Sequence, residues 1–166
     1  MLDACLAGLQ SGMVGVLWML AWLGLSAAWQ RRSFWTPENL LATLFYGDAA
    51  IRPQFSFQTL SGLAVYLILY SLLGAVFATA VKLRLARLRL YLLSIVFALS
   101  WYYIAYHILW KAASPLIALL YPERATLVGH LLYGVILAGY PKHIPRTNPP
   151  EPMPSPVQSV SSPDPA

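Results

Sequence analysis

The sequence predicts an all-α membrane protein with four transmembrane helices, two short interfacial helices and a disordered C-terminal tail. Hydrophobic residues make up 58% of the 166 residues and charged residues only 10%. The apolar residues form long runs without charge, and prolines gather after residue 140. A soluble domain of this size cannot bury so much apolar surface, so we expect residues 1–140 to lie in a lipid bilayer.

Three apolar runs are long enough to cross a bilayer, at about residues 4–30, 55–81 and 90–110. At ~1.5 Å per residue, even the shortest of them reaches across the ~30 Å of a hydrocarbon core. The first run follows Asp3 and no basic residue, and it is too long for the apolar part of a signal peptide. We therefore expect it to be retained.

A fourth run, at about residues 125–140, is shorter and contains His130 and three glycines. As a helix it reaches only ~24 Å, so spanning needs a locally thinner bilayer or polar side chains that extend to the surface. The alternative is a re-entrant segment. We expect a span, which completes a four-helix domain over residues 1–140.

Short interfacial helices are predicted at about residues 37–46 and 115–121. The first begins with Thr-Pro-Glu at 36–38, which suits a helix start, and Gly47 is a natural end. Its apolar residues fall on one side (Leu40, Leu41, Leu44 and Phe45) and its polar residues elsewhere (Glu38, Asn39 and Thr43). This pattern predicts a helix that lies in the headgroup plane.

The two halves of the chain share a pattern of long run, short helix and long run. Thr-Leu-Ser-Gly at 59–62 is followed by Tyr66 in the first half, and Thr-Leu-Val-Gly at 126–129 by Tyr133 in the second. A duplication would relate the halves by a two-fold axis along the membrane normal. The alternative is coincidence among residues that are common in membrane helices.

Basic residues indicate the orientation. Lys82, Arg84, Arg87 and Arg89 lie in the short link between the second and third spans, with no acidic residue among them. Because short cytoplasmic loops are rich in Lys and Arg, we expect this link and both termini in the cytoplasm. The same topology accounts for the net charge of +5, and the basic residues form no continuous face for nucleic acid.

The segment 141–166 is rich in proline and serine and cannot build a hydrophobic core. We expect it to be disordered. A domain that recognises residues 149–156 in polyproline form is an alternative to a passive end.

Small residues at helical spacing predict where the spans pack, because helices in lipid associate through close backbone approach and buried hydrogen bonds. The expected packing residues are Gly8, Gly12 and Gly15 in the first span, Gly62, Tyr66, Tyr70, Gly74 and Ala78 in the second, and Gly129 and Tyr133 in the fourth. The tyrosine hydroxyl groups either bond to neighbouring helix carbonyls or line a polar cavity.

The sequence contains no constellation for catalysis, such as a HExxH helix, a phosphate loop or paired carboxylates. Cys5 is the only cysteine, which excludes an intrachain disulfide. Two histidines lie about one turn from span ends on the same side, His107 in the third span and His130 in the fourth. They are either isolated interfacial residues or a pair of ligands for the iron of a haem b.

Residues 35–42 (Trp-Thr-Pro-Glu-Asn-Leu-Leu-Ala), 45–47 (Phe-Tyr-Gly) and 129–134 (Gly-His-Leu-Leu-Tyr-Gly) resemble segments of small uncharacterised bacterial four-helix inner-membrane proteins. The resemblance covers the chain before Pro141. It implies a location in the bacterial inner membrane, and no known activity or ligand comes with it.

Small-residue seams without reactive groups favour a non-enzymatic protein that acts as a helix-bundle scaffold or as an accessory subunit of a membrane complex. Its expected partners are the lipid bilayer and either other membrane subunits or further copies of the chain, and not nucleic acid. Two other functions stay open. One is a small channel or facilitator, and the other is a haem-binding electron-transfer element that uses His107 and His130.

Overall fold

The computed structural model describes residues 1–81, 85–113, 117 and 120–144, and all regular structure in these residues is helical. The elements are α1 (Leu2–Trp29), α2 (Thr36–Tyr46), η1 (Gly47–Ala50), α3 (Phe57–Ala80), α4 (Arg87–Ile104), η2 (Ala105–Leu109), α5 (Trp110–Ala113), α7 (Glu123–Leu137) and η3 (Tyr140–His143). η1 and η3 are 3-10 helices, and η2 is a π-helical segment within the helix that runs from α4 to α5. The expected all-α class is confirmed.

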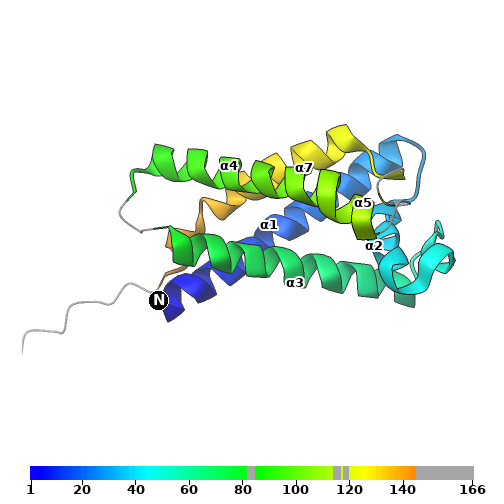
Figure 1. Ribbon diagram of the computed structural model, residues 1–166, viewed down its shortest axis with the longest axis horizontal. Helices are drawn as coiled ribbons and strands as arrows, with labels where there is room; N and C mark the ends of the chain where they lie inside the picture. The colour runs from blue at the N-terminus through cyan, green and yellow to red at the C-terminus, as the bar shows by residue number, and fades with distance from the viewer. Residues whose placement is uncertain (82–84, 114–116, 118–119, 145–166) are drawn as a thin grey trace, which may run out of the picture.

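The long helices run alternately in opposite directions, so that α1, α3, α4–α5 and α7 form a bundle (Figure 1). α1 packs against both α3 and α7, whereas α4 packs mainly against α7. We call one end of the bundle the termini end, because it holds Met1, η3, the end of α3 and the start of α4 (Figure 1). The other end, which holds α2 and η1, is the cap end.

Within the described residues, three helices are long and apolar enough to cross a membrane: Leu2–Trp29, Phe57–Ala80 and Arg87–Ala112. They correspond to the first three predicted spans, and the third is longer than the expected 90–110 because the helix begins at Arg87 and continues to Ala112. α7 has only 15 residues, which is ~22 Å of helix.

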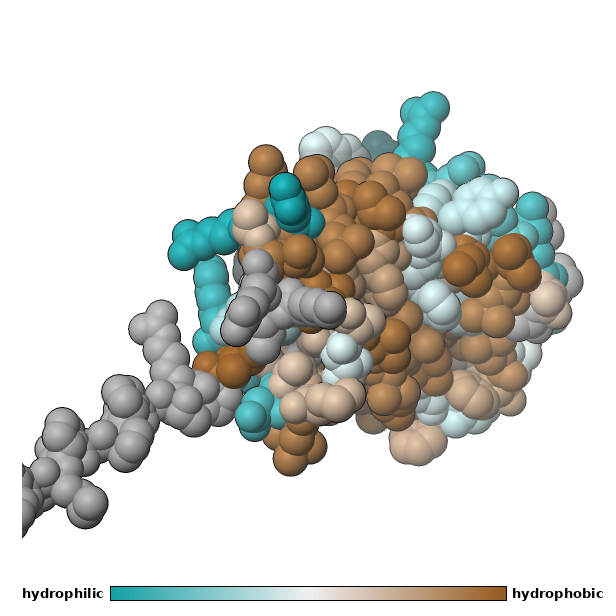
Figure 2. Space-filling model, turned by 60° about the vertical axis from the view of Figure 1, so that its left-hand side comes forward, coloured by the Kyte–Doolittle hydropathy of each residue, from teal (hydrophilic) through white to brown (hydrophobic). Residues whose placement is uncertain are grey.

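The outward-facing side chains of the long helices are largely apolar. Figure 2 shows hydrophobic residues over much of one face of the molecule. Exposed apolar side chains include Leu17 and Trp18 on α1, Ile68 and Leu72 on α3, Leu92 and Val96 on α4, and Leu132 and Val135 on α7. Such a surface is what lipid tails solvate and water does not.

α1 and α3 approach so closely that side chains would not fit between their backbones. A Cβ atom on Gly12 would lie 2.6 Å from the carbonyl oxygen of Tyr70, and one on Gly74 would lie 2.9 Å from Cα of Gly12. A Cβ atom on Gly8 would lie 2.6 Å from Cβ of Ala78. The glycine-containing faces of α1 and α3 are therefore in direct contact, as close packing in lipid requires.

Glycines also allow close contacts on two sides of α7. The ring of Tyr133 lies against Gly15 of α1, where a Cβ atom would be 2.8 Å from it. On the other side, a Cβ atom on Gly134 would lie 3.0 Å from Cα of Ile95 in α4. These contacts hold α7 between α1 and α4, which agrees with its position in Figure 1.

Corresponding positions of the two sequence halves have different neighbours. Gly62 contacts the backbone of Glu38 in α2, whereas Gly129 faces the side chain of Met19 in α1. The second predicted interfacial helix, at 115–121, falls largely outside the described residues. The internal duplication therefore stays a prediction.

α2 begins and ends as the sequence predicts, but the expected exposure of its polar side is wrong. Glu38 and Asn39 are each only 2% exposed, and Thr43 is also buried, whereas the apolar Phe45 is 62% exposed. The helix packs against α3 with its polar side chains inside. The sequence pattern could not reveal this, because the polar partners of Asn39 come from other segments.

The folded part of the chain extends past residue 140, where the sequence suggested that it ends. Residues 140–143 form η3, which packs against α1. Tyr140 is fully buried, its ring centroid lies 6.0 Å from that of Phe77, and its hydroxyl group donates a hydrogen bond to the carbonyl of Val81. The predicted disordered tail lies outside the described residues from 145 onward.

Candidate functional site

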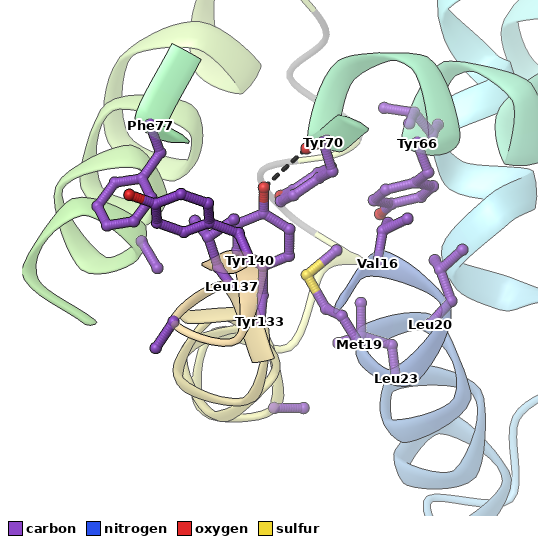
Figure 3. Packing of buried hydrophobic residues seen from close by; sticks show 14 of the residues in the cluster. Val16, Met19, Leu20, Leu23, Tyr66, Tyr70, Phe77, Tyr133, Leu137 and Tyr140 are labelled. Carbon is purple, nitrogen blue, oxygen red and sulfur yellow. Dashed lines mark hydrogen bonds between the residues drawn. The ribbon is translucent and has the colours of Figure 1, made fainter. Parts of the chain in front are cut away.

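Buried polar side chains gather inside the bundle towards the cap end. We call six of them the tyrosine–histidine cluster: Tyr66 and Tyr70 of α3, Tyr121, and Thr126, His130 and Tyr133 of α7. Figure 3 shows Tyr66, Tyr70 and Tyr133 beside the apolar side chains of α1. Tyr66, Tyr70, Tyr133 and His130 are residues that the sequence analysis selected, and the fold brings them together.

The hydrogen bonds of His130 fix its tautomer. Its Nδ1 lies 2.8 Å from the carbonyl oxygen of Thr126, which can only accept, so Nδ1 carries the hydrogen. In the neutral imidazole Nε2 is then an acceptor, and the hydroxyl group of Tyr70, at 2.7 Å, donates to it. Both ring nitrogens are therefore engaged within the bundle.

The remaining tyrosines complete the cluster. The hydroxyl groups of Tyr66 and Tyr121 are hydrogen-bonded to each other, and the hydroxyl group of Tyr133 donates to the carbonyl of Tyr70 at 2.7 Å (Figure 3). One sequence interpretation, a bond to a helix carbonyl, thus holds for Tyr133. Tyr66 and Tyr70 instead bond to other side chains.

The interior space beside the cluster is small. It is lined by Met19, Leu23, Trp110 and members of the cluster, and its volume is about 10 Å³. This is room for about one water molecule. In the described part of the chain the cluster thus links helices to one another, and its cavity is too small for a solute larger than water.

A second set of hydrogen bonds attaches α2 to the bundle. The side-chain amide of Asn39 donates to the carbonyl of Arg52 at 2.7 Å, and its oxygen accepts from the hydroxyl group of Thr59 at 2.6 Å. Thr59 also accepts from the backbone N–H of Ser56, which begins α3. Asn39 therefore connects α2, the loop before α3 and α3 itself.

Glu38 is the one carboxyl group of α2, and it is buried. Among the described residues, its Oε2 atom has no hydrogen-bond partner. Burial raises the pKa of this carboxyl from 4.5 to about 7, because the charged form loses its hydration. The side chain therefore changes its charge near neutral pH.

The two histidines of the haem hypothesis lie near the same aromatic ring. The ring centroid of Tyr102 is 6.3 Å from that of His107 and 5.3 Å from that of His130. His107 lies on η2 and is half-buried. Iron ligation by His130 would first require Tyr70 to leave Nε2, so the geometry offers no open ligand there, and haem binding stays a prediction.

Two hollows open at the surface of the cap end. The first has a volume of about 250 Å³ and includes Arg32, Ser33 and Arg52 in its lining. The second, of about 560 Å³, lies between the end of α1 and the start of α7 and includes Gln30 and Arg124. Both lie at the end of the apolar surface of the long helices.

Sequence reasoning missed part of this site. It placed Glu38 and Asn39 on an outer surface and gave Tyr121 no role, although all three are buried. The Ser-x-x-Thr spacing at 56–59 could have indicated the capping box that starts α3. No local signal identifies Tyr121 as the partner of Tyr66, because their contact joins distant segments.

No protein-family model, curated protein or solved structure matches this chain. A function must therefore be argued from the helices, their contacts and their surface.

Proposed function

We propose that the chain is a non-enzymatic four-span membrane protein that serves as a helix-bundle scaffold or accessory subunit of a membrane complex. The observation that carries this proposal is the use of small and polar groups inside the bundle. Gly8, Gly12 and Gly74 bring α1 and α3 together, and the hydroxyl groups of Tyr66 and Tyr70 bond to partners within the chain. Such an interior stabilises a rigid bundle, whose outer faces are left for lipid and partners.

The surface of α7 supports the fourth span. Leu127, Leu132 and Val135 are exposed on it and are apolar like the outward residues of the three longer helices. α7 also runs beside α1 and α4 through the same layer of the bundle (Figure 1). A helix of ~22 Å crosses a bilayer where the lipid is locally thinned.

We propose that both termini face the cytoplasm of a bacterial cell. The exposed residues Arg87, Arg89 and Lys142 all belong to the termini end, and Lys82 and Arg84 lie outside the described residues. Basic residues in short connections favour the cytoplasmic side. A reporter that is active only outside the cytoplasm, fused after residue 146, should be inactive. An active fusion would contradict either this orientation or the fourth span.

α4 is the face that we propose for a partner. In the apolar part of the helix Arg87–Ala112, which begins with α4, only 22% of the residues are buried. The corresponding share is 44% for α1 and 39% for α3. The outward residues of α4 and of η2, which continues it, include Leu92, Val96 and Ile108. A transmembrane helix of another subunit or of a second copy would cover this apolar strip.

Site-specific photo-crosslinking in native membranes tests the proposal. A photoreactive residue at Val96 of α4 should form protein–protein adducts, whereas one at Leu17, an equally apolar and exposed position of α1, should react with lipid. Crosslinking to lipid alone at both positions, together with a bare monomer after mild-detergent purification, would contradict the proposal.

The two other functions are not favoured by a specific contact and stay predictions. Solute flux into liposomes would reveal a channel or facilitator. A Soret band in the purified protein, lost on replacement of His107 or His130, would reveal a haem carrier.

A further inference from the structure

The first hollow of the cap end brings together two arginines from different segments. Arg32 follows α1, and Arg52 follows η1, 20 residues later in the chain. Ser33, just before α2, and Thr36 and Asn39 of α2 complete the polar part of the lining. The volume of about 250 Å³ lies below the ~300 Å³ at which pockets for drug-sized ligands begin, so it suits a small polar group.

The hollow presents hydrogen-bond donors and positive charge. Arg32 donates from Nη1 to the carbonyl of Leu120 at 2.9 Å, and Arg52 donates from Nε to the carbonyl of Ala49 at 3.1 Å. Each of these bonds holds a guanidinium group by one of its five N–H donors. The hydroxyl oxygen of Ser33 accepts the N–H of Trp35, which leaves its hydrogen to donate outward.

Acidic side chains do not neutralise this lining. The carboxyl groups in the described cap end belong to Glu38, Asp48 and Glu123, and none of them lines the hollow. Glu38 is buried within the bundle, and Glu123 belongs to the second hollow. The local charge of the first hollow is therefore that of two guanidinium groups.

Aromatic side chains place the hollow at the membrane surface. The ring of Trp35 packs against that of Phe55 at a centroid distance of 4.9 Å, and Trp29, at the end of α1, is 87% exposed. Tryptophan is enriched at the level of lipid headgroups. The hollow also lies between the end of α1 and the start of α3, where the apolar surface of both helices stops.

We infer that this hollow binds a phosphate group at the membrane surface, supplied by the headgroup of an anionic phospholipid. Guanidinium groups match phosphate oxygens in both charge and geometry. A lipid whose phosphate lies between Arg32 and Arg52 can place its acyl chains along exposed apolar residues such as Ile51 and Phe55. This inference does not depend on the proposed scaffold function, because a lipid site serves any membrane protein.

Native mass spectrometry of the full chain released from mild detergent tests the site. Phosphatidylglycerol should bind in preference to phosphatidylcholine. In Arg52→Gln this preference should fall about tenfold, as expected for the loss of one charge-assisted contact. Arg124→Gln is the matched control, because it removes one exposed charge from the same end but from the second hollow. It should keep the preference.

Arg32→Gln should also lower the preference for phosphatidylglycerol. Because the Arg32 side chain also donates a hydrogen bond to the carbonyl of Leu120, this variant needs a folding control, which is an unchanged far-UV circular dichroism spectrum. Arg52 is exposed, so Arg52→Gln decides the test even where Arg32→Gln does not fold. An equal loss in Arg124→Gln would overturn the site in favour of diffuse surface charge. Binding of inorganic phosphate, lost in Arg52→Gln but without any preference for phosphatidylglycerol, would overturn the lipid source.

Discussion

At the scale of single residues, Gly12 and Glu38 affect the stability of the fold in opposite ways. Gly12 allows the backbones of α1 and α3 to touch, and its replacement would force them apart. Glu38 does the opposite, because a buried carboxylate whose Oε2 atom has no hydrogen-bond partner among the described residues opposes folding when it is charged. Each residue leads to a measurable prediction.

Replacement of Glu38 by Gln should remove a pH dependence. The pKa of this carboxyl is about 7 in the folded chain, against 4.5 for an ordinary glutamate. Glu38 therefore binds its proton more tightly in the folded chain than in the unfolded chain. The contribution of this proton to the free energy of unfolding is fully present below pH 4.5 and is lost as the pH rises to about 7. The loss is roughly 3 kcal/mol.

Thermal unfolding in mild detergent between pH 4.5 and 8 measures this effect. Glu38→Gln should be more stable than the natural chain at pH 8 and should vary less between these values. Equal pH profiles of the two proteins would show that this carboxyl is hydrated in solution.

Gly12→Val should destabilise the bundle by roughly 1–3 kcal/mol, because the added atoms meet the backbone of Tyr70 and Ser71. Ala21→Val is the matched control, because Ala21 is exposed on the same helix, and it should change the free energy of unfolding by less than about 0.5 kcal/mol. Denaturation in detergent compares the two. Similar losses would mean that α1 and α3 are not in close contact.

At the scale of elements, α2 shows how the end of the bundle is closed. It is held by buried polar contacts. Both its polar residue Asn39 and its apolar residue Leu41 are buried, unlike those of a helix that lies on the membrane surface. The start and end of α2 could be predicted from Thr-Pro-Glu at 36–38 and from Gly47, although no side chain caps the first turn: Trp35 is the N-cap residue, and the hydroxyl group of Thr36 donates to the carbonyl of Ser33. The orientation of α2 could not be predicted, because Asn39 finds its partners at Arg52 and Thr59.

Asn39→Ala should loosen α2 specifically. The change leaves the hydroxyl group of Thr59 and the carbonyl of Arg52 without their partner, at a cost of about 1–3 kcal/mol. Hydrogen exchange measured by mass spectrometry should accelerate in 36–50 and stay unchanged in α1. Gln30→Ala, which removes an exposed bond to Ser26, should have no such effect. Uniform acceleration over the whole chain would contradict the role of Asn39.

At the scale of the whole molecule, periodicity and charge predicted the helical class and three long helices, because long runs without charge have few other uses. The contacts that define the interior were less accessible. Tyr66 and Tyr70 were recognised as members of one helix face, but their partners Tyr121 and His130 are 55 and 60 residues away. The length of the fourth segment left its path through the membrane open, since 15 residues suit a short span as well as a re-entrant helix.

Bilayer thickness should affect α7 more than α1. α7 is ~22 Å long and α1, with 28 residues, ~42 Å. In nanodiscs with short-chain lipids the amides of α7 should exchange more slowly than in nanodiscs with long-chain lipids, because a thin bilayer covers both of its ends. The middle of α1 should be equally protected in both. Equal exchange of α7 in the two lipids would contradict a fourth span.

The π-helical segment η2 sets the direction in which the side chains of α5 point. A π turn accommodates one residue more than an α turn, so the residues beyond it are rotated by ~100° relative to an uninterrupted α-helix. Trp110 is the first of them, and it lines the space beside Tyr121 and His130. Regular α-helical geometry over the same residues would swing the indole out of that space, whereas deletion of a single amino acid within 105–109 would restore α-helical geometry and leave its direction unchanged, so the wide turn itself aims the tryptophan.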